Sequence, residues 1–318
     1  MSNILVAGGG GFVGSHLTEV LLARGDRVTV VDNFATGRRS NVAHLTTDPG
    51  FTLIEHDVTL TLPASITGGR FDFVLDLASP ASPLDFATMP LEILAVGSTG
   101  TRNLLDLAEA QGARFFLAST SEVYGDPLVH PQPETYWGNV SSTGPRSCYD
   151  EAKRFSEALT MAYHRFRGVD VRIVRLFNTY GERMRPDDGR VVNTFIVQAL
   201  RGAPITLHGD GAQTRSFCYV ADEVAGLVAV LDGDLVGPVN VGNPGEFTMR
   251  ELADLVLELT GSSSEIVCVP LPAEREGDPL QRQPDITLIR STYGWEPTVS
   301  LRDGLTRMID HFRVNESL

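Results

Sequence analysis

The chain has 318 residues, which is long for a single domain, and 42% of them are apolar, which is enough for a sizeable core. A formal net charge of −14 disfavours nucleic acid or an anionic membrane surface as a partner. No apolar run reaches the roughly 18 residues of a membrane-spanning helix, and the N-terminus leads at once into a strand, which leaves no room for a signal peptide. Three scattered cysteines indicate neither disulfides nor a metal cluster. We therefore expect a cytoplasmic protein without a metal site.

The first half of the chain alternates short apolar strands with amphipathic helices, the pattern of a parallel sheet covered on both faces. The predicted strands cover residues 3–7, 27–31, 52–55, 71–78, 114–120 and 170–177, and long helices are expected at 91–111 and 149–167. This alternation predicts an α/β fold with a doubly wound parallel sheet of the Rossmann type.

After about residue 178 the alternation gives way to loops rich in proline and glycine. Helices are predicted near residues 192–201, 222–231, 249–260 and 301–313. We expect a dinucleotide-binding domain at residues 1–178 and a smaller substrate-binding lobe at 179–318, with residues of about 213–242 returning to the sheet.

A glycine-rich loop lies between the first predicted strand and the first helix. Gly8, Gly11 and Gly14 recur at every third position, which permits a tight turn and the close approach of a pyrophosphate to the helix N-terminus. Asp32 ends the second strand, where a carboxylate binds a ribose 2′-hydroxyl and repels a 2′-phosphate. The pattern predicts a dinucleotide and favours NAD over NADP, although such loops are common and Asp32 could also be a turn residue.

Tyr149 and Lys153 stand four residues apart, on one face of a predicted helix. Of the 26 basic residues 25 are arginine, and Lys153 is the single lysine. A position that keeps lysine in such a chain indicates a need for a compact ammonium with a tunable pKa, which arginine cannot provide. We predict that this ammonium lowers the pKa of the phenol, so that Tyr149 acts as a base.

Polar residues follow the predicted strand at 114–120. Thr120, Ser121 and Glu122 stand at the C-terminal end of a parallel strand, where such folds position their chemistry. Thr120 can hydrogen-bond the substrate oxygen that Tyr149 deprotonates. Glu122 is either part of the site or an outward-facing polar residue.

These motifs resemble the extended short-chain dehydrogenase/reductase superfamily. Longer segments look like the UDP-glucuronate decarboxylases (UDP-xylose synthases) within it, namely residues 31–34, 36–38, 77–83, 118–127, 144–146, 177–181, 183–192, 213–215 and 284–286. The resemblance covers nearly the whole chain. Its long segments are specific, whereas the glycine loop is shared with many relatives.

The resemblance implies an enzyme that binds NAD and a UDP-sugar. In this family NAD takes a hydride from carbon 4 of UDP-glucuronate, the 4-ketone loses carbon dioxide, and return of the hydride gives UDP-xylose. The implied catalytic residues are Thr120, Ser121, Glu122, Tyr149, Lys153 and Arg282. Glu122 and Arg282 are assigned to the carboxylate-bearing end of the sugar; without the resemblance, Arg282 would be interpreted as a solvated loop residue.

The resemblance also implies two sets of binding residues. The cofactor-binding residues are Gly8, Gly11, Phe12, Val13, Asp32, Asn33, Thr36, Gly37, Asp57, Val58, Leu77, Ser79, Ala118, Tyr149, Lys153 and Thr179. The substrate-binding residues are Asn178, Arg185, Arg190, Val192, Gln213 and Arg215. Charge supports the second set, because Arg183, Arg185 and Arg190 cluster in an acidic chain and arginine binds diphosphates bidentately. Asp187 and Asp188 leave open the alternative of an internally paired loop.

Two positions depart from the family pattern. Gly97 stands where many superfamily members carry Asn, and Asp76 replaces a His that is often found. The first departure puts one structural or proton-relay contact in doubt. Neither removes a group that the chemistry requires.

Three alternative functions compete with decarboxylation. A nucleotide-sugar 4,6-dehydratase carries Asp where this chain has Ser121, and serine cannot act as an acid at neutral pH. A UDP-glucuronate 4-epimerase uses the same hydride step but usually lacks an acid at the position of Glu122. A non-catalytic NAD-sensing protein tends to lose the pair formed here by Tyr149 and Lys153. The residues present therefore favour decarboxylation.

The two long helices predicted at residues 91–111 and 149–167 also suggest how the protein forms oligomers. In superfamily relatives two such helices pair with their copies across a two-fold axis. The resemblance implies a homodimer whose interface contains Leu94, Leu104, Leu105, Ala158, Leu159 and Ala162.

Overall fold

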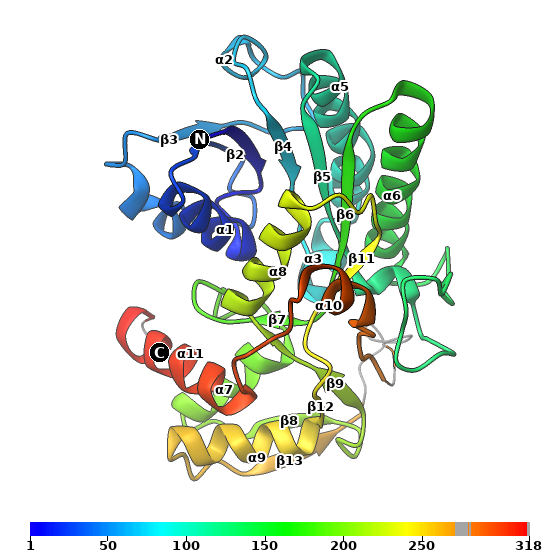
Figure 1. Cartoon of the computed structure of the whole chain (residues 1–318). Helices are drawn as coiled ribbons and strands as arrows, with labels where there is room; N and C mark the ends of the chain where they lie inside the picture. The colour runs from blue at the N-terminus through cyan, green and yellow to red at the C-terminus, as the bar shows by residue number, and fades with distance from the viewer. Residues whose placement is uncertain (271–278, 280, 317–318) are drawn as a thin grey trace.

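The computed structural model describes residues 1–270, 279 and 281–316. Its centre is a seven-stranded parallel sheet with the order β11-β6-β5-β4-β1-β2-β3 (Figure 1). The strands are β1 (Asn3–Ala7), β2 (Arg27–Asp32), β3 (Phe51–Glu55), β4 (Phe73–Asp76), β5 (Arg114–Thr120), β6 (Val171–Leu176) and β11 (Val239–Val241). The α/β fold with a doubly wound sheet is confirmed. The strand order reverses between β1 and β4, which opens a crevice where such sheets bind ligands.

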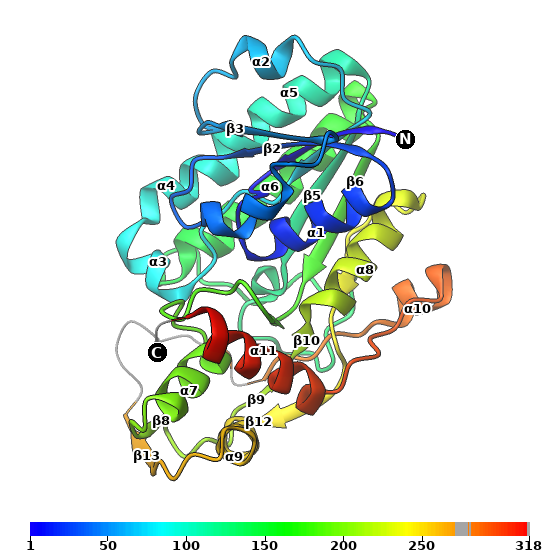
Figure 2. The ribbon, with the colours of Figure 1, turned by 90° about the vertical axis from the view of Figure 1, so that its left-hand side faces the viewer.

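Helices cover both faces of the sheet (Figure 2). On one face lie α1 (Phe12–Ala23) and α8 (Val220–Asp232), and on the other lie α5 (Thr101–Gln111) and α6 (Ser147–Arg167), with the short α2 (Ala64–Thr67) and α3 (Pro83–Thr88) at the strand ends. Leu104 and Leu105 are fully buried in the second layer, in one cluster with Phe115 and Leu117 of β5. The expectation that both leucines contribute to a dimer interface is therefore wrong, because their side chains already pack against the sheet.

The helix predicted at residues 91–111 is a helical run in three parts. It begins with α4 (Pro90–Ala95), continues as one π-helical turn (Val96–Gly100) and ends as α5. At this turn the run packs tightly on α6, since a Cβ added to Gly97 would lie 2.8 Å from the Cβ of Ala152. The turn therefore has no room for a larger residue unless the two helices move apart.

The second half of the chain builds a lobe beyond the C-terminal edge of the sheet (Figure 1). It contains α7 (Val191–Leu200), α9 (Met249–Thr260), α10 (Thr287–Tyr293) and α11 (Leu301–Asn315). Three small sheets pair β7 (Thr179–Tyr180) with β10 (Cys218–Tyr219), β9 (Thr214–Ser216) with β12 (Glu246–Thr248), and β8 (Ile205–His208) with β13 (Ile266–Val269). Between these elements the chain returns to the large sheet through α8 and β11. A division into two domains at residue 178 stays a prediction.

The lobe is tied to the face of the sheet that carries α1. Arg183 forms an ion pair with Glu19 at 2.5 Å, and the ring of His16 hydrogen-bonds the Glu182 carbonyl at 3.0 Å. One hydrophobic cluster runs without interruption from α1 through α8 to α11. The two halves of the chain thus share a core.

Candidate active site

Only glycine fits at Gly8, in the loop between β1 and α1, and at Gly14, in the first turn of α1. A Cβ on Gly8 would lie 2.6 Å from the Leu77 carbonyl oxygen, and a Cβ on Gly14 would lie 2.2 Å from that of Gly8. Gly8 also has a φ of +80°. The N-terminus of α1 therefore borders a cavity, whose lining includes Gly8, Gly11, Phe12, Val13, Thr36, Leu77, Ser79, Ala118 and Thr179. Because the glycine loop carries no side chains, a pyrophosphate can approach the N-terminus of α1 closely, as dinucleotides do in such folds.

Asp32 lies at the end of β2, beside this loop. Its carboxylate accepts hydrogen bonds from the amides of Gly10 and Phe34, both at 2.8 Å. Burial raises the pKa of Asp32, and these two bonds oppose the shift. Asp32, Asn33, Gly37, Asp57 and Val58 are not among the described residues that line the cavity. Their contacts with a cofactor stay predictions.

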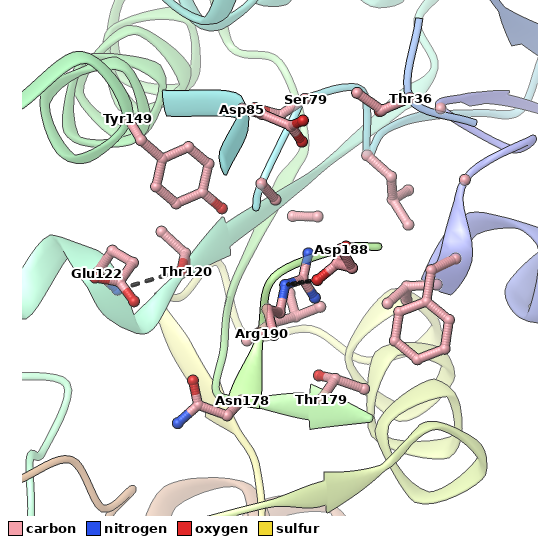
Figure 3. Close-up of a pocket in the computed structure, with 18 of the residues that line it drawn as sticks. Thr36, Ser79, Asp85, Thr120, Glu122, Tyr149, Asn178, Thr179, Asp188 and Arg190 are labelled. Carbon is pink, nitrogen blue, oxygen red and sulfur yellow. Dashed lines mark hydrogen bonds and ion pairs between the residues drawn. The ribbon is translucent and has the colours of Figure 1, made fainter. Parts of the chain in front are cut away.

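Tyr149, Lys153 and Thr120 meet at the inner end of the cavity. Figure 3 shows the Tyr149 ring and the Thr120 side chain beside each other. Lys153 Nζ donates a hydrogen bond to the Ala118 carbonyl at 3.0 Å. Burial raises the pKa of Tyr149 to about 12, and its hydrogen bond with Thr120 opposes that shift. Lys153 is not among the main groups that shift this pKa, so the predicted lowering of the phenol's pKa by its ammonium is not seen in the unliganded protein.

Glu122 is the second residue of a turn of 3₁₀-helix (Ser121–Tyr124) that directly follows β5. Its two carboxylate oxygens bind two guanidiniums, Arg146 at 2.6 Å and Arg282. Burial alone would raise the pKa of Glu122, but Arg146 and Arg282 lower it to about 2. Glu122 is consequently an anion held between two cations throughout the physiological pH range.

Arg282 is almost fully buried, and it also donates to the Gly125 carbonyl at 3.0 Å. Its Nε has no hydrogen-bond partner among the described residues. Asp150 lies close enough to Glu122, Arg146 and Arg282 to be influenced by their charges. Burial and the negative charge of Glu122 raise the pKa of Asp150 to about 7. With Asp150 protonated, one carboxylate faces two guanidiniums, so the cluster has a net positive charge that suits an acidic substrate.

A second cavity, with a volume of about 660 Å³, extends from this cluster into the lobe. Glu122, Arg146, Asn178, Thr179 and Arg190 line both cavities and therefore mark their junction. The second cavity is also lined by Val192, Gln213, Arg215 and Arg282, together with residues of β8 and α7. The arrangement offers one space for a dinucleotide, which Tyr149 lines, and a second space for another ligand, and the two spaces meet at Glu122.

The basic cluster is paired with carboxylates. Arg185 contacts Asp85 at 3.2 Å and lines the first cavity, and Arg190 contacts Asp188 at 3.0 Å (Figure 3). These pairs match the alternative of an internally paired loop, in part through Asp85 of α3. A diphosphate would have to compete with these carboxylates for both arginines, so their role in binding stays a prediction.

Sequence reasoning missed two features of the site. In the sequence, Arg146 was noted only as part of the segment 144–146 that resembles the family. Its position three residues before Tyr149, at the N-terminus of α6, could have indicated that it lies near Tyr149. Phe86 of α3 stacks on the Tyr149 ring with centroids 4.8 Å apart, a contact between distant segments that no local pattern indicates.

Other classes of site are absent from the described part of the chain. No group of three or more His, Cys, Asp or Glu residues there could hold a metal ion. Likewise, none of the helices in those residues has the length and apolar character needed to cross a membrane.

Comparison with known proteins places this site in a family. UDP-glucuronic acid decarboxylase 1 of Arabidopsis thaliana is 54% identical over 310 residues, which cover 98% of this chain and 69% of the relative. The protein of the same name from Danio rerio is 50% identical over 97% of this chain and 72% of its own length.

Solved structures agree with this relationship. The UDP-glucuronic acid 4-epimerase of Bacillus cereus, in complex with UDP-glucuronic acid and NAD, superposes with a TM-score of 0.88 at 29% identity, over 98% of this chain and 99% of that one. Residues 4–242 match the family described as the NAD dependent epimerase/dehydratase family. The chain therefore belongs to the NAD dependent epimerase/dehydratase family, and its cofactor is NAD.

Proposed function

We propose that the protein is an NAD-dependent UDP-glucuronate decarboxylase that forms UDP-xylose through a 4-keto intermediate. The observation that carries the proposal is the Glu122 carboxylate held by Arg146 and Arg282, where the cavity that contains Tyr149 meets the cavity of the lobe. The decarboxylases at 50–54% identity support it as well.

The first step is oxidation at carbon 4 of the sugar. Thr120 and Tyr149 stand side by side to hold the 4-hydroxyl, and the Tyr149 oxygen takes its proton. Lys153, fixed by the Ala118 carbonyl, would supply a positive charge at the lining of the cofactor cavity. NAD supplies the hydride acceptor for this step and the hydride donor for the final reduction.

The second step is loss of the carboxylate. A ketone at carbon 4 is β to the carboxylate on carbon 5, so the electrons of the breaking bond are delocalised into the carbonyl and carbon dioxide leaves. Arg282 and Arg146 line the lobe cavity beside Glu122 and orient the carboxylate by charge. Protonation at carbon 5 then restores the ketone for reduction.

The competing activities fit the site less well. The buried Ser121 stands where a dehydratase needs an acid, and a hydroxyl cannot protonate a leaving group at neutral pH. A 4-epimerase must suppress decarboxylation and usually lacks a carboxylate at the position of Glu122. A non-catalytic sensor has no use for a buried tyrosine and lysine at the end of the cofactor cavity.

Incubation with UDP-glucuronate and NAD tests the proposal. Decarboxylation lowers the mass of the sugar nucleotide by one carbon dioxide, whereas epimerisation leaves the mass unchanged. Appearance of UDP-xylose supports the proposal, and conversion to an isomer of unchanged mass would favour the epimerase instead.

We also propose that the protein is a homodimer that pairs through the outer faces of α4 and α6. Leu91, Leu94 and Phe155 are large apolar side chains exposed on these faces, with Ala158 exposed and Leu159 and Ala162 partly exposed beside them. The double variant Leu94→Asp, Phe155→Asp should be monomeric by light scattering, while the parent is a dimer. A parent that is monomeric at micromolar concentration refutes the dimer. The cytoplasmic location stays a prediction.

A further inference from the structure

Asp76 is a buried carboxylate at the point where β4 ends. It lies between Ala7 of β1 and Leu117 of β5, and its side chain is 2% exposed. One carboxylate oxygen accepts a hydrogen bond from Thr101 Oγ1 at 2.8 Å, and the other accepts one from the Ala78 amide at 3.2 Å. No guanidinium among the described residues forms an ion pair with it. A buried carboxylate without such a partner is costly unless another cation lies near.

Lys153 is that cation. Its ammonium is buried and donates a hydrogen bond to the carbonyl of Ala118, the residue of β5 that follows the position paired with Asp76. Burial lowers the pKa of Lys153, and the charges that oppose this shift are first Asp76 and then Glu157. Burial likewise raises the pKa of Asp76, and Lys153 is the largest opposing influence. Each group therefore favours the ionised form of the other.

Glu157, the second carboxylate near Lys153, already has partners of its own. Arg175 binds both of its oxygens, at 2.9 and 2.7 Å, and the Ser119 hydroxyl donates to it at 2.6 Å. Much of the charge of Glu157 is thus neutralised locally, whereas that of Asp76 is available to Lys153.

A row of short polar contacts fixes Asp76 relative to the helix that carries Lys153. Thr101 Oγ1, which donates to Asp76, also lies 3.3 Å from Ser156 Oγ, and Ser156 donates to the Gly97 carbonyl at 2.7 Å. The row joins β4, the π-helical turn with α5, and α6. The two positions that depart from the family pattern, Asp76 and Gly97, therefore stand at its two ends.

We propose that Asp76 is a positioning residue that keeps the ammonium of Lys153 charged in the buried site. The proposal concerns the ionisation of one lysine and does not depend on the identity of the sugar substrate. Loss of the Asp76 charge would leave Lys153 dependent on the partly neutralised Glu157, so that the ammonium would lose its proton at lower pH.

The single lysine of the chain makes the test direct. Labelling with [ε-¹³C]lysine gives one side-chain resonance, whose titration reports Lys153 in the unliganded protein without any assignment. We expect the Asp76→Asn variant, which keeps the shape and an acceptor for Thr101, to titrate about one pH unit or more below the parent. The matched control is Asp26→Asn, which removes a buried carboxylate paired with Arg24 at the opposite end of the sheet and should leave the Lys153 titration unchanged.

The proposal is overturned if the midpoint of the Lys153 titration is the same in Asp76→Asn as in the parent. It is also overturned if the parent itself titrates with a midpoint below pH 7. If Asp76→Asn does not fold, Asp76→His serves in the same measurement, because a histidine is uncharged in the alkaline range where the lysine titrates. Thr101→Val should lower the thermal midpoint but shift the lysine titration less than Asp76→Asn does, because the charge remains. In the turnover assay, the alkaline limb of the pH profile should move with the lysine midpoint, whereas a merely structural role would lower activity equally at every pH.

Discussion

Replacing Glu122 with Gln separates the chemistry at carbon 5 from binding. In the parent, the pKa of Glu122 falls from 4.5 to about 2, a difference of roughly 3 kcal/mol at about 1.4 kcal/mol per unit. Because the folded-state pKa is depressed, this stabilisation is present above pH 4.5 and is lost as the pH falls toward 2. The Glu122→Gln variant should therefore be less stable by up to about 3 kcal/mol at pH 7, and the difference should shrink at pH 3.

The consequence for turnover should be larger than that for binding. We expect UDP-xylose formation to fall about 10²–10⁴-fold, the range for loss of a positioned ionisable group. Binding of UDP, which carries no carboxylate, should not change by calorimetry. Some 4-epimer can form if the ketone persists long enough to be reduced from its other face.

The matched control is Glu258→Gln, which breaks a solvent-exposed pair with Arg302 and should leave the urea midpoint nearly unchanged at both pH values. Urea unfolding at both pH values and mass analysis of the products measure the two effects. If Glu122→Gln makes UDP-xylose at the parent rate, Glu122 is structural and plays no part in the chemistry at carbon 5.

Three further predictions follow from the site. Tyr149→Phe removes the base of the first step, so ketone formation, carbon dioxide release and UDP-xylose should fail together, by at least about 10²-fold; loss of one without the others would contradict this role. NAD should bind more tightly than NADP to protein stripped of cofactor, by calorimetry, and the reverse order would exclude the role of Asp32. Asp150, whose pKa is raised to about 7, costs stability as the pH rises from about 4 toward 7; Asp150→Asn should therefore be more stable than the parent at pH 8 but not at pH 4, and equal urea midpoints at pH 8 would refute this.

Six of the seven strands of the large sheet could be predicted closely because each is a short apolar run bounded by turn residues; β11, with three residues, was expected only as part of a segment that returns to the sheet. The predicted ranges 3–7 and 114–120 coincide with β1 and β5. The small strands of the lobe could not be found, since β7 and β10 have two residues each and pair across about forty positions of sequence. Such strands depend on the tertiary fold and leave no periodic pattern.

For helices and site residues, the sequence shows which side chains are apolar or reactive, but it does not show which neighbours they face in the fold. Leu104 and Leu105 were recognised as apolar, yet nothing local shows whether they face the sheet or another subunit. The chemistry at Thr120, Glu122, Tyr149 and Lys153 could be inferred because a motif carries it. That Arg185 meets Asp85, one hundred residues away, depends on how α3 packs against the loop, and no spacing rule contains it.

The return of the chain to the sheet has a consequence for any attempt to isolate the cofactor-binding half. β11 covers the outer edge of β6, with Val239 beside Val174 and Val241 beside Leu176. A fragment that ends at residue 178 would lose this strand and also α8, leaving the apolar β6 as an open edge with one bare face. Open edges of this kind recruit strands from other molecules. Such a fragment should aggregate, and protease sites introduced near residue 178 should nick the chain without releasing a separately soluble half.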